Sequence, residues 1–144
     1  MTLFSEASGR KVVSTGNAAT VGKIKTFIVD AASQKVVGLR LSKTPAAGTV
    51  LPWPGIHAFG ADAVTITDAN LIVEPDPQLA ALDVKQHTII GKQVLTTEGR
   101  KVGSVVDVDF DPADGRLVSV VLSDHSIEGA KFVGVGSYAV VVKA

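Results

Sequence analysis

The sequence predicts an all-β protein built from two small β-barrels, and three observations lead to this expectation. Short runs of alternating apolar and polar residues recur along the chain, and β-branched valine is abundant in them. Stretches rich in Gly, Pro and Asp separate these runs and are typical of turns. One part of the chain also repeats the pattern of another, so the two barrels are expected to come from an internal repeat.

The repeat is visible when residues 9–42 are aligned with residues 91–123. A second match joins residues 60–66 to residues 136–142. Identical residues at the same spacing, apart from one extra residue near Gly16 in the first copy, indicate two copies of one structural unit. The matched residues are Gly9 and Gly91, Val12 and Val94, Gly22 and Gly103, Asp30 and Asp111, and Leu41 and Leu122.

The second copy contains the clearest strand pattern of the chain. Val106, Val108 and Phe110 alternate with polar residues, which predicts that these three side chains share one buried face. Asp107 and Asp109 are then expected on the outer face of the same strand.

A turn is predicted directly after this strand, at DPADG (111–115). Aspartate and proline stand early in it, and Gly115 lies where a positive φ is expected. The first copy repeats the hairpin with the weaker turn AASQK (31–35). Gly22 and Gly103 are also assigned to structural turns.

A unit of about 50 to 60 residues with short strands can bury its strand edges by curling into a small barrel. We expect one barrel from residues 1–68, a linker with a short helical turn from residues 69–90, and a second barrel from residues 91–144. The linker is apolar enough to pack the two barrels together, or to form a self-association surface. Its apolar residues are Leu71, Ile72, Val73, Leu79 and Leu82.

Composition narrows the classes of function. The formal net charge is zero, so the chain lacks the basic footprint of a direct nucleic-acid binder. There is no cysteine, which removes disulfides, zinc thiolates and cysteine nucleophiles. No secretory leader is recognised, and the apolar runs are far shorter than the roughly 20 residues of a membrane span. We expect a soluble, cytoplasmic protein without membrane insertion.

Several motifs resemble the PRC-barrel domain family. They are GRKVVS, VGKIKTFIVDAASQKVVGLRLS and VLPWPGIHAFGADAVTI in the first copy, and GKQVLT, VGSVVDVDFDPADGRLVSVVLS and GSYAVVV in the second. The resemblance covers nearly all of residues 9–68 and 91–143. The second copy departs from the pattern, because GAKFVGV stands where the first copy has LPWPGIHAF.

This resemblance implies two PRC-type barrels in tandem and a non-catalytic role in docking a protein partner through a barrel face or edge. Relatives in the family include the cytoplasmic domain of the photosynthetic reaction-centre H subunit and the C-terminal domain of a ribosome-maturation factor. The second relative raises the hypothesis of a ribosome-associated RNA-processing factor that acts through a ribosomal protein. We expect no enzymatic activity and no cofactor.

Four aspartates, Asp107, Asp109, Asp111 and Asp114, are weak candidates for a metal site. Their spacing is similar to the opening of a calcium loop, but Pro112 stands where that loop needs glycine. The interpretation we favour is an exposed strand face followed by turn capping. Binding of a cation here, or of a small molecule in the cleft between the barrels, stays open as an alternative function.

The three histidines, His57, His87 and His125, are scattered and lack the close spacing of zinc ligands. No nucleophile elbow or phosphate-binding glycine loop is present. The sequence therefore offers no candidate for a catalytic residue.

Trp53 is the only tryptophan, and Pro52 and Pro54 hold it in a stiff, extended segment. It is expected either to plug the end of the first barrel or to bind a protein partner, because aromatic residues contribute much of the binding energy at interfaces. Trp53, Pro52, Pro54 and His57 are the candidate partner-binding residues. Small barrels with open edges commonly pair, so a homodimer is also expected.

Overall fold

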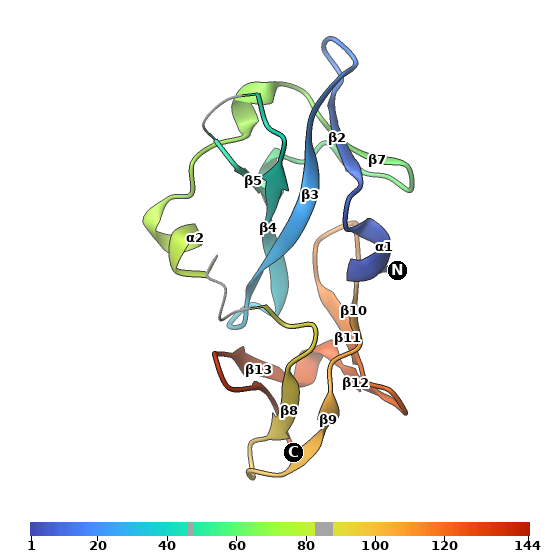
Figure 1. Cartoon of the computed structure of the whole chain (residues 1–144), viewed down its shortest axis with the longest axis vertical. Helices are drawn as coiled ribbons and strands as arrows, with labels where there is room; N and C mark the ends of the chain where they lie inside the picture. Colours follow the sequence, from blue (N-terminus) through green and yellow to red (C-terminus); the bar gives the residue numbers. More distant parts are fainter. Residues whose placement is uncertain (46–47, 83–87) are drawn as a thin grey trace.

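The computed structural model describes residues 1–45, 48–82 and 88–144. The fold is all-β, as the sequence predicts. The molecule is elongated, and the strands of residues 9–68 (the N-terminal half) lie above those of residues 91–144 (the C-terminal half) in Figure 1.

The described residues form fourteen strands, most of them short, and several brief helices. The N-terminal segment (residues 1–8) forms β1 (Thr2–Leu3) and α1 (Phe4–Ala7). The N-terminal half forms β2 (Lys11–Ser14), β3 (Ala19–Asp30), β4 (Lys35–Ser42), β5 (Val50–Pro52), the 3-10 helix η1 (Trp53–Gly55), β6 (Ala58–Phe59) and β7 (Ala63–Ile66). The linker (residues 69–90) forms η2 (Ala69–Leu71) and α2 (Pro77–Leu82). The C-terminal half forms β8 (Gln93–Thr96), β9 (Lys101–Ser104), β10 (Asp107–Phe110), β11 (Leu117–Val121), β12 (Ser126–Glu128), η4 (Gly129–Lys131), β13 (Phe132–Val135) and β14 (Val140–Val142).

The N-terminal half forms one six-stranded sheet in the order β5-β4-β3-β2-β7-β6. Neighbouring strands are antiparallel except β2 and β7, which run parallel with Val12 opposite Val64. The parallel pair brings the start and the end of this half side by side.

The C-terminal half pairs its strands in the same sequence of partners but divides them between two sheets, β13-β14-β8-β9 and β1-β10-β11-β12. Strands β14 and β8 are parallel, with Val140 opposite Val94, as β7 and β2 are. The counterpart of the long strand β3 is interrupted between β9 and β10. This interruption separates the two sheets.

The same interruption explains an expectation that is wrong. Val106 was placed on the buried face with Val108 and Phe110, yet its side chain is 55% exposed while the other two are fully buried. Alternation predicts a common face only along an unbroken strand, and β10 starts after Val106.

The described strand pairings do not close either half into a barrel. β5 and β6 are the end strands of the six-stranded sheet, and they span only three and two residues. Edges this short offer few backbone groups for closing a ladder. The structure therefore has the small β units that the PRC-type pattern implies, but their described sheets are open and are not closed barrels.

Two of the three glycines assigned to turns lie inside strands. Gly22 is in β3, where an added Cβ would approach Leu41 Cδ1 at 3.3 Å. Gly103 is in β9, where an added Cβ would lie 2.7 Å from Leu122 Cδ2. Both glycines therefore make room for a leucine on the returning strand of their own half. Only Gly115 occupies a turn, with the positive φ of 82° that was expected.

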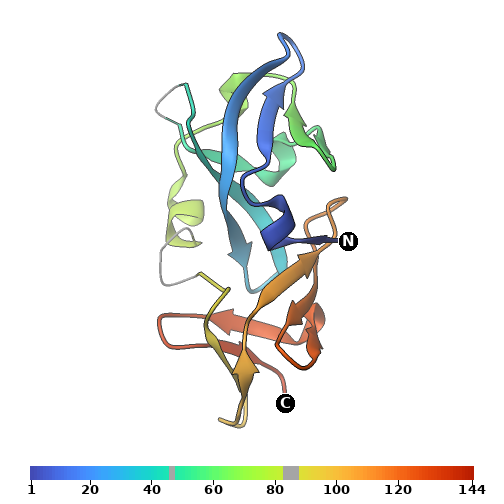
Figure 2. The same ribbon diagram turned by 45° about the vertical axis from the view of Figure 1, so that its right-hand side comes forward.

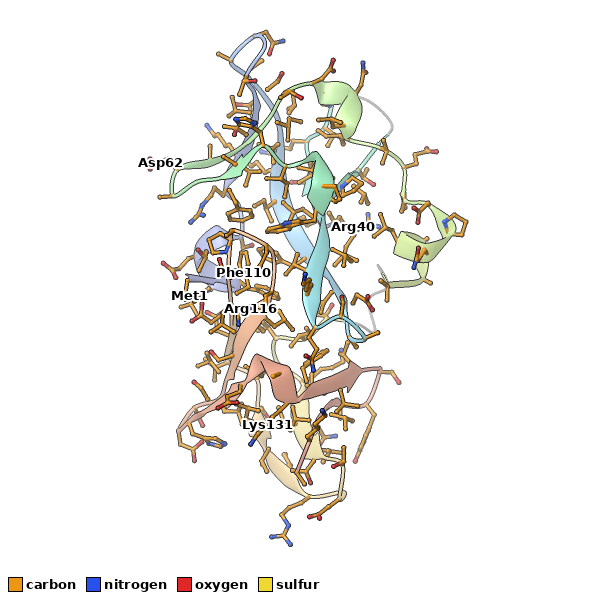
Figure 3. The ribbon with its side chains drawn as sticks, turned by 180° about the vertical axis from the view of Figure 1, so that it is seen from behind. Met1, Arg40, Asp62, Phe110, Arg116 and Lys131 are labelled. Atoms are coloured by element: carbon orange, nitrogen blue, oxygen red, sulfur yellow. The ribbon has the colours of Figure 1, made fainter. Side chains whose placement is uncertain are left out.

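A cluster of five aromatic rings fills the seam between the halves. Phe110, at the end of β10, is fully buried at its centre (Figure 3). Its ring centroid lies 5.4 to 6.4 Å from those of Phe4, Phe27, Trp53 and Phe59, mostly edge to face. The N-terminal segment and the two halves consequently share one hydrophobic core.

The described part of the linker packs mainly on the N-terminal half instead of joining the two halves. Val73 and Val50 exchange backbone hydrogen bonds of 2.8 and 2.9 Å, and Ile72 enters the core. Helix α2, with Leu79 and Leu82 half-buried, contacts β3. An apolar linker sequence predicts burial, but the surface that it covers depends on where the chain leads it.

The N-terminal segment connects both halves. β1 pairs with β10, so the start of the chain adds a strand to a sheet of the C-terminal half. The next residue, Phe4, stacks on Phe27 of β3 with ring centroids 4.1 Å apart. Whether strands cross between the halves could not be read from the sequence, and the structure shows that one does.

We predict that Phe110→Ala lowers the free energy of unfolding by about 3–5 kcal/mol, because it leaves a cavity at the centre of the shared core. Urea denaturation followed by Trp53 fluorescence measures the effect, and a single transition is expected. The matched control is Val106→Ala at an exposed site, with a change within about 0.5 kcal/mol. A Phe110→Ala effect as small as that of the control would show that the seam is not part of the core.

Candidate interaction site at the junction of the halves

Two hairpin turns meet at the junction, the turn between β3 and β4 and the turn between β10 and β11. The Val36 N–H donates to the Gly115 carbonyl at 2.8 Å, and the Leu117 N–H donates to the Gln34 carbonyl at 3.0 Å. Each turn thus satisfies a backbone donor at the start of the other half's returning strand. The two halves are locked together by this reciprocal pairing.

In the first of these contacts, a tryptophan lies against a glycine. An added Cβ on Gly115 would lie 3.2 Å from Trp53 Cε2 and 2.6 Å from the Val36 carbonyl oxygen. Gly115 is therefore required both by its positive φ and by the close approach of the indole. This contact fixes the position of Trp53.

In the second contact, Gln34 stands where the first has Gly115, and Gly129 stands where the first has Trp53. Gln34 has a positive φ of 58°, and its Nε2 donates to the carbonyls of Ala130 at 2.8 Å and Phe132 at 2.7 Å. Gly129, which begins η4 as Trp53 begins η1, lies against the backbone of Leu117, where an added Cβ would collide with the Leu117 carbonyl. Here the junction is sealed by hydrogen bonds.

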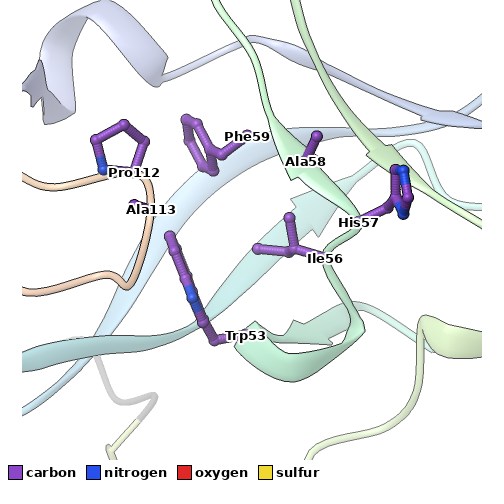
Figure 4. A pocket seen from close by; sticks show the side chains of 7 residues that line it. All are labelled: Trp53, Ile56, His57, Ala58, Phe59, Pro112 and Ala113. Atoms are coloured by element: carbon purple, nitrogen blue, oxygen red, sulfur yellow. The ribbon is translucent and has the colours of Figure 1, made fainter.

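The tryptophan side of the junction is hollowed into a pocket of about 360 Å³ (Figure 4). Trp53 and Phe59 form stacked walls, with centroids 5.9 Å apart and ring planes 18° from parallel. The turn of the C-terminal half supplies the remaining wall. The lining residues are Trp53, Ile56, His57, Ala58, Phe59, Pro112 and Ala113.

The structure brings two of the four candidate partner-binding residues into this pocket. Trp53 is half-buried and packs against the core, and His57 is exposed. Pro52 ends β5 and Pro54 lies in η1, so both frame Trp53 without lining the pocket. Trp53 therefore combines a structural contact with an accessible surface, and its role in binding stays a prediction.

The aspartates do not form the exposed row that was expected. Asp107 is 8% exposed and accepts hydrogen bonds from the backbone N–H of Ser5 at 3.2 Å and from its hydroxyl. Its carboxylate holds the first turn of α1 in place. Asp109 is half-buried, and its Oδ1 accepts no hydrogen bond from the described residues.

Asp111 and Asp114 cap the turn, as predicted. Asp111 Oδ1 accepts from the Ala113 N–H at 2.9 Å, and Asp114 Oδ1 accepts from the Arg116 N–H at 3.0 Å. The Arg116 guanidinium also lies 3.7 Å from Asp111 Oδ2. Within residues 1–45, 48–82 and 88–144, no group of three or more His, Cys, Asp or Glu side chains is arranged to hold a metal ion.

The histidines remain apart in the structure. His125 donates from Nδ1 to Asp124 Oδ1 at 2.7 Å, and this bond and the imidazole charge lower the pKa of the exposed Asp124 carboxyl. His57 lies at the pocket, whereas His87 is outside the described residues. Among the described residues, no helix has both the length and the apolar character to span a membrane.

Comparison with protein-family models finds a match in the C-terminal part of the chain. Residues 83–143 match the model of the PRC-barrel domain. The chain contains a PRC-barrel domain. The match covers the C-terminal half, and the likeness of the N-terminal half to the PRC-barrel pattern rests on its motifs and on its equivalent strand pairing. No curated protein matches the chain.

Sequence reasoning missed the pocket residues Pro112 and Ala113, and it missed the role of Gln34. Pro112 and Ala113 were recognised only as turn residues, because turn chemistry does not say which surface the turn will meet. Gln34 stands in the weak turn AASQK, and its two acceptors lie 96 and 98 residues further along the chain. No local pattern reports such contacts.

We predict that Gly115→Ala destabilises the protein more than Gly91→Ala does. Both glycines have a positive φ, which costs alanine about 1–2 kcal/mol. Gly91 has open space around its Cα, whereas the added methyl at position 115 would displace the Val36 carbonyl or Trp53, at a further cost of about 1–3 kcal/mol. Urea denaturation measures both variants, and only Gly115→Ala should shift the Trp53 emission maximum. Equal losses of stability would show that the turn contact is loose.

Proposed function

We propose that this protein is a non-catalytic docking module, in which the pocket at the junction of the halves receives an apolar side chain of a protein partner. The observation that carries the proposal is Trp53, held between Gly115 and Phe59 with part of its surface exposed. Large aromatic residues in fixed positions are the usual centres of binding energy at protein interfaces.

The composition of the pocket supports a protein partner. Its walls are mainly apolar, and His57 is the only ionisable side chain among the lining residues. An apolar centre with few charges is typical of the core of an interface. The backbone of both walls is held by turns that bond across the junction, so little ordering is needed upon binding.

We propose no catalytic role and no cofactor for this chain. The carboxylates Asp107, Asp111 and Asp114 are engaged in capping backbone N–H groups, which is a structural use. Asp124, whose pKa His125 lowers, is exposed in the hairpin between β11 and β12 and not in a cleft. A general acid or base would need a perturbed group inside a cleft.

We also infer that the chain is a tandem of two PRC-type units. Equivalent parallel pairs, β2 with β7 and β8 with β14, and equivalent glycine–leucine contacts support this inference. We propose that the protein is located in the cytoplasm. The absence of cysteine is compatible with that reducing compartment.

A small molecule is the second candidate ligand for the same pocket. Its volume of about 360 Å³ falls at the lower end of the range of roughly 300–1,000 Å³ for ligand sites. A cation is not favoured, and we predict that millimolar calcium leaves the melting temperature unchanged within error. A clear calcium-dependent rise of the melting temperature would contradict the structural interpretation of the aspartates.

We predict that Ala58→Arg and Ala113→Arg each abolish capture of the partner, because the new side chains fill the pocket without removing core atoms. Both alanines are exposed and line the pocket. The tagged chain is used for affinity capture from a lysate of its own organism, read by mass spectrometry. Ala81→Arg, at an exposed position on α2, is the matched control and should retain the partner.

The captured protein is then purified and titrated against the chain while Trp53 fluorescence is recorded. A saturable change of fluorescence with wild type and Ala81→Arg that is absent in both pocket variants supports docking at the pocket. If the partner is a ribosomal protein, this result would connect the chain to ribosome maturation. A partner that binds all four proteins equally would refute docking at this pocket. If only a small molecule changes the fluorescence, the second candidate replaces the first.

A further inference from the structure

Strand β13 leaves an open edge on the C-terminal half. It is the end strand of the sheet β13-β14-β8-β9, and the hairpin that it forms with β14 projects from the molecule, in dark red in Figures 1 and 2. Gln34 already occupies the carbonyls of Ala130 and Phe132. The part of the edge that remains open therefore begins at Val133.

At two positions in this hairpin, no contact or backbone angle in the described chain requires glycine. Neither Gly134 nor Gly136 has a positive φ, and an added Cβ on either would meet nothing within 4 Å. Glycine inside a strand weakens it, and it is found where another backbone or a ligand approaches closely. The open space beside Gly134 is thus suited to a second strand.

The side chains around these glycines are apolar and exposed. Val133 is 43% exposed, and Tyr138, the only tyrosine, is 72% exposed. Residues 132–142 contain neither a charged side chain nor a proline. Charges and prolines are the usual means by which an edge strand is protected from pairing.

The other sheet ends of the described chain carry such protection. β5 ends in Pro52, β9 begins with Lys101, and β12 ends in Glu128. β1 and β6 span two residues each. Among these ends, β13 alone combines four residues with an uncharged, proline-free edge.

Comparison with β6, the counterpart of β13, shows what is missing. Arg10 lies over the Phe59 ring at 5.7 Å and donates to the Gly60 carbonyl at 2.9 Å, so it covers the β6 hairpin. Lys92 stands in the place of Arg10, but its Nζ donates to the Thr88 carbonyl at 2.7 Å and does not reach β13. In the C-terminal half, Gln93 Nε2 donates to the Tyr138 carbonyl at 3.2 Å in this hairpin, but among the described residues no cation lies over a ring of β13.

We propose that a second copy of this chain covers β13, by antiparallel pairing of the two β13 strands about a two-fold axis near Gly134. A two-fold dimer of this kind closes on itself and satisfies both edges at once. An uncharged strand matches its own copy, and the zero net charge of the chain adds no repulsion between copies.

The flanking charges are compatible with this geometry. With Gly134 opposite its counterpart, Lys131 lies beside Ser137 of the second copy and not beside the second Lys131. Six residues at about 3.3 Å each separate the two lysines along the ladder, roughly 20 Å, which exceeds the screening length of about 8 Å at physiological salt. The glycines allow the two backbones to approach, and Val133 and Tyr138 supply apolar contact.

Sedimentation velocity of the full chain tests the proposal. Wild type at concentrations up to about 100 μM is expected to approach twice the 14.8 kDa mass of one chain. Val133→Arg should raise the dimer dissociation constant by about 30-fold or more, as loss of a central contact does. Gly134→Leu should weaken the dimer similarly, because the side chain has room in the monomer but not between two backbones.

Two controls separate this interface from the rest of the molecule. Val106→Arg changes a similarly exposed valine outside β13 and should leave the dimer intact. Ala113→Arg, which blocks the pocket, should also leave it intact, so failure of the docking function and failure of the dimer are distinguishable. A monomeric wild type, or a Val133→Arg variant that remains dimeric, would overturn the proposal. Capture of a different protein that is lost only with Val133→Arg would reassign the edge to that protein.

Discussion

Burial of Phe110 is the interaction on which the rest of the structure depends. Each half has only open sheets, and units of this size bury so little apolar surface that they are marginally stable alone. Phe110 extends from the C-terminal half into aromatic rings of the N-terminal half and the N-terminal segment. The halves are thereby combined into one core, and the turns that meet beside this ring are brought within hydrogen-bonding distance.

The junction has similar backbones and different side chains on its two sides. η1 and η4 have closely similar flanking dihedral angles, with Pro52 at φ −60° and ψ 145° and Glu128 at φ −57° and ψ 138°. Trp53 lies against Gly115 on one side, and Gln34 donates to the Ala130 and Phe132 carbonyls on the other. A bulky ring beside a glycine leaves a pocket, whereas an amide bonded to two carbonyls closes the surface. A few side-chain differences between the two sides therefore leave a pocket on the Trp53 side and a closed surface on the Gln34 side.

Much of the local structure could be predicted, and the errors share one cause. The hairpin turn at DPADG, the strands around it and the equivalence of the two copies follow from short-range patterns. Asp107 was placed on an exposed face because it alternates with Val108 and Phe110, but α1 packs on β10 and covers Asp107. Its partner Ser5 is 102 residues away, so nothing near Asp107 in the sequence indicates that it is buried. Two of the candidate partner-binding residues, Trp53 and His57, line the pocket, but its second wall was not foreseen.

By itself, the sequence determined the all-β class, the turn at DPADG and the likeness of residues 83–143 to the PRC-barrel domain, because strand alternation and turn chemistry act over a few residues. Only the tertiary structure decided which surfaces meet. It placed β1 on the C-terminal half, the linker on the N-terminal half, and Pro112 opposite Trp53. The physical reason is that a period of two shows which side chains turn inward, while the surface that they meet depends on contacts between residues far apart in the chain.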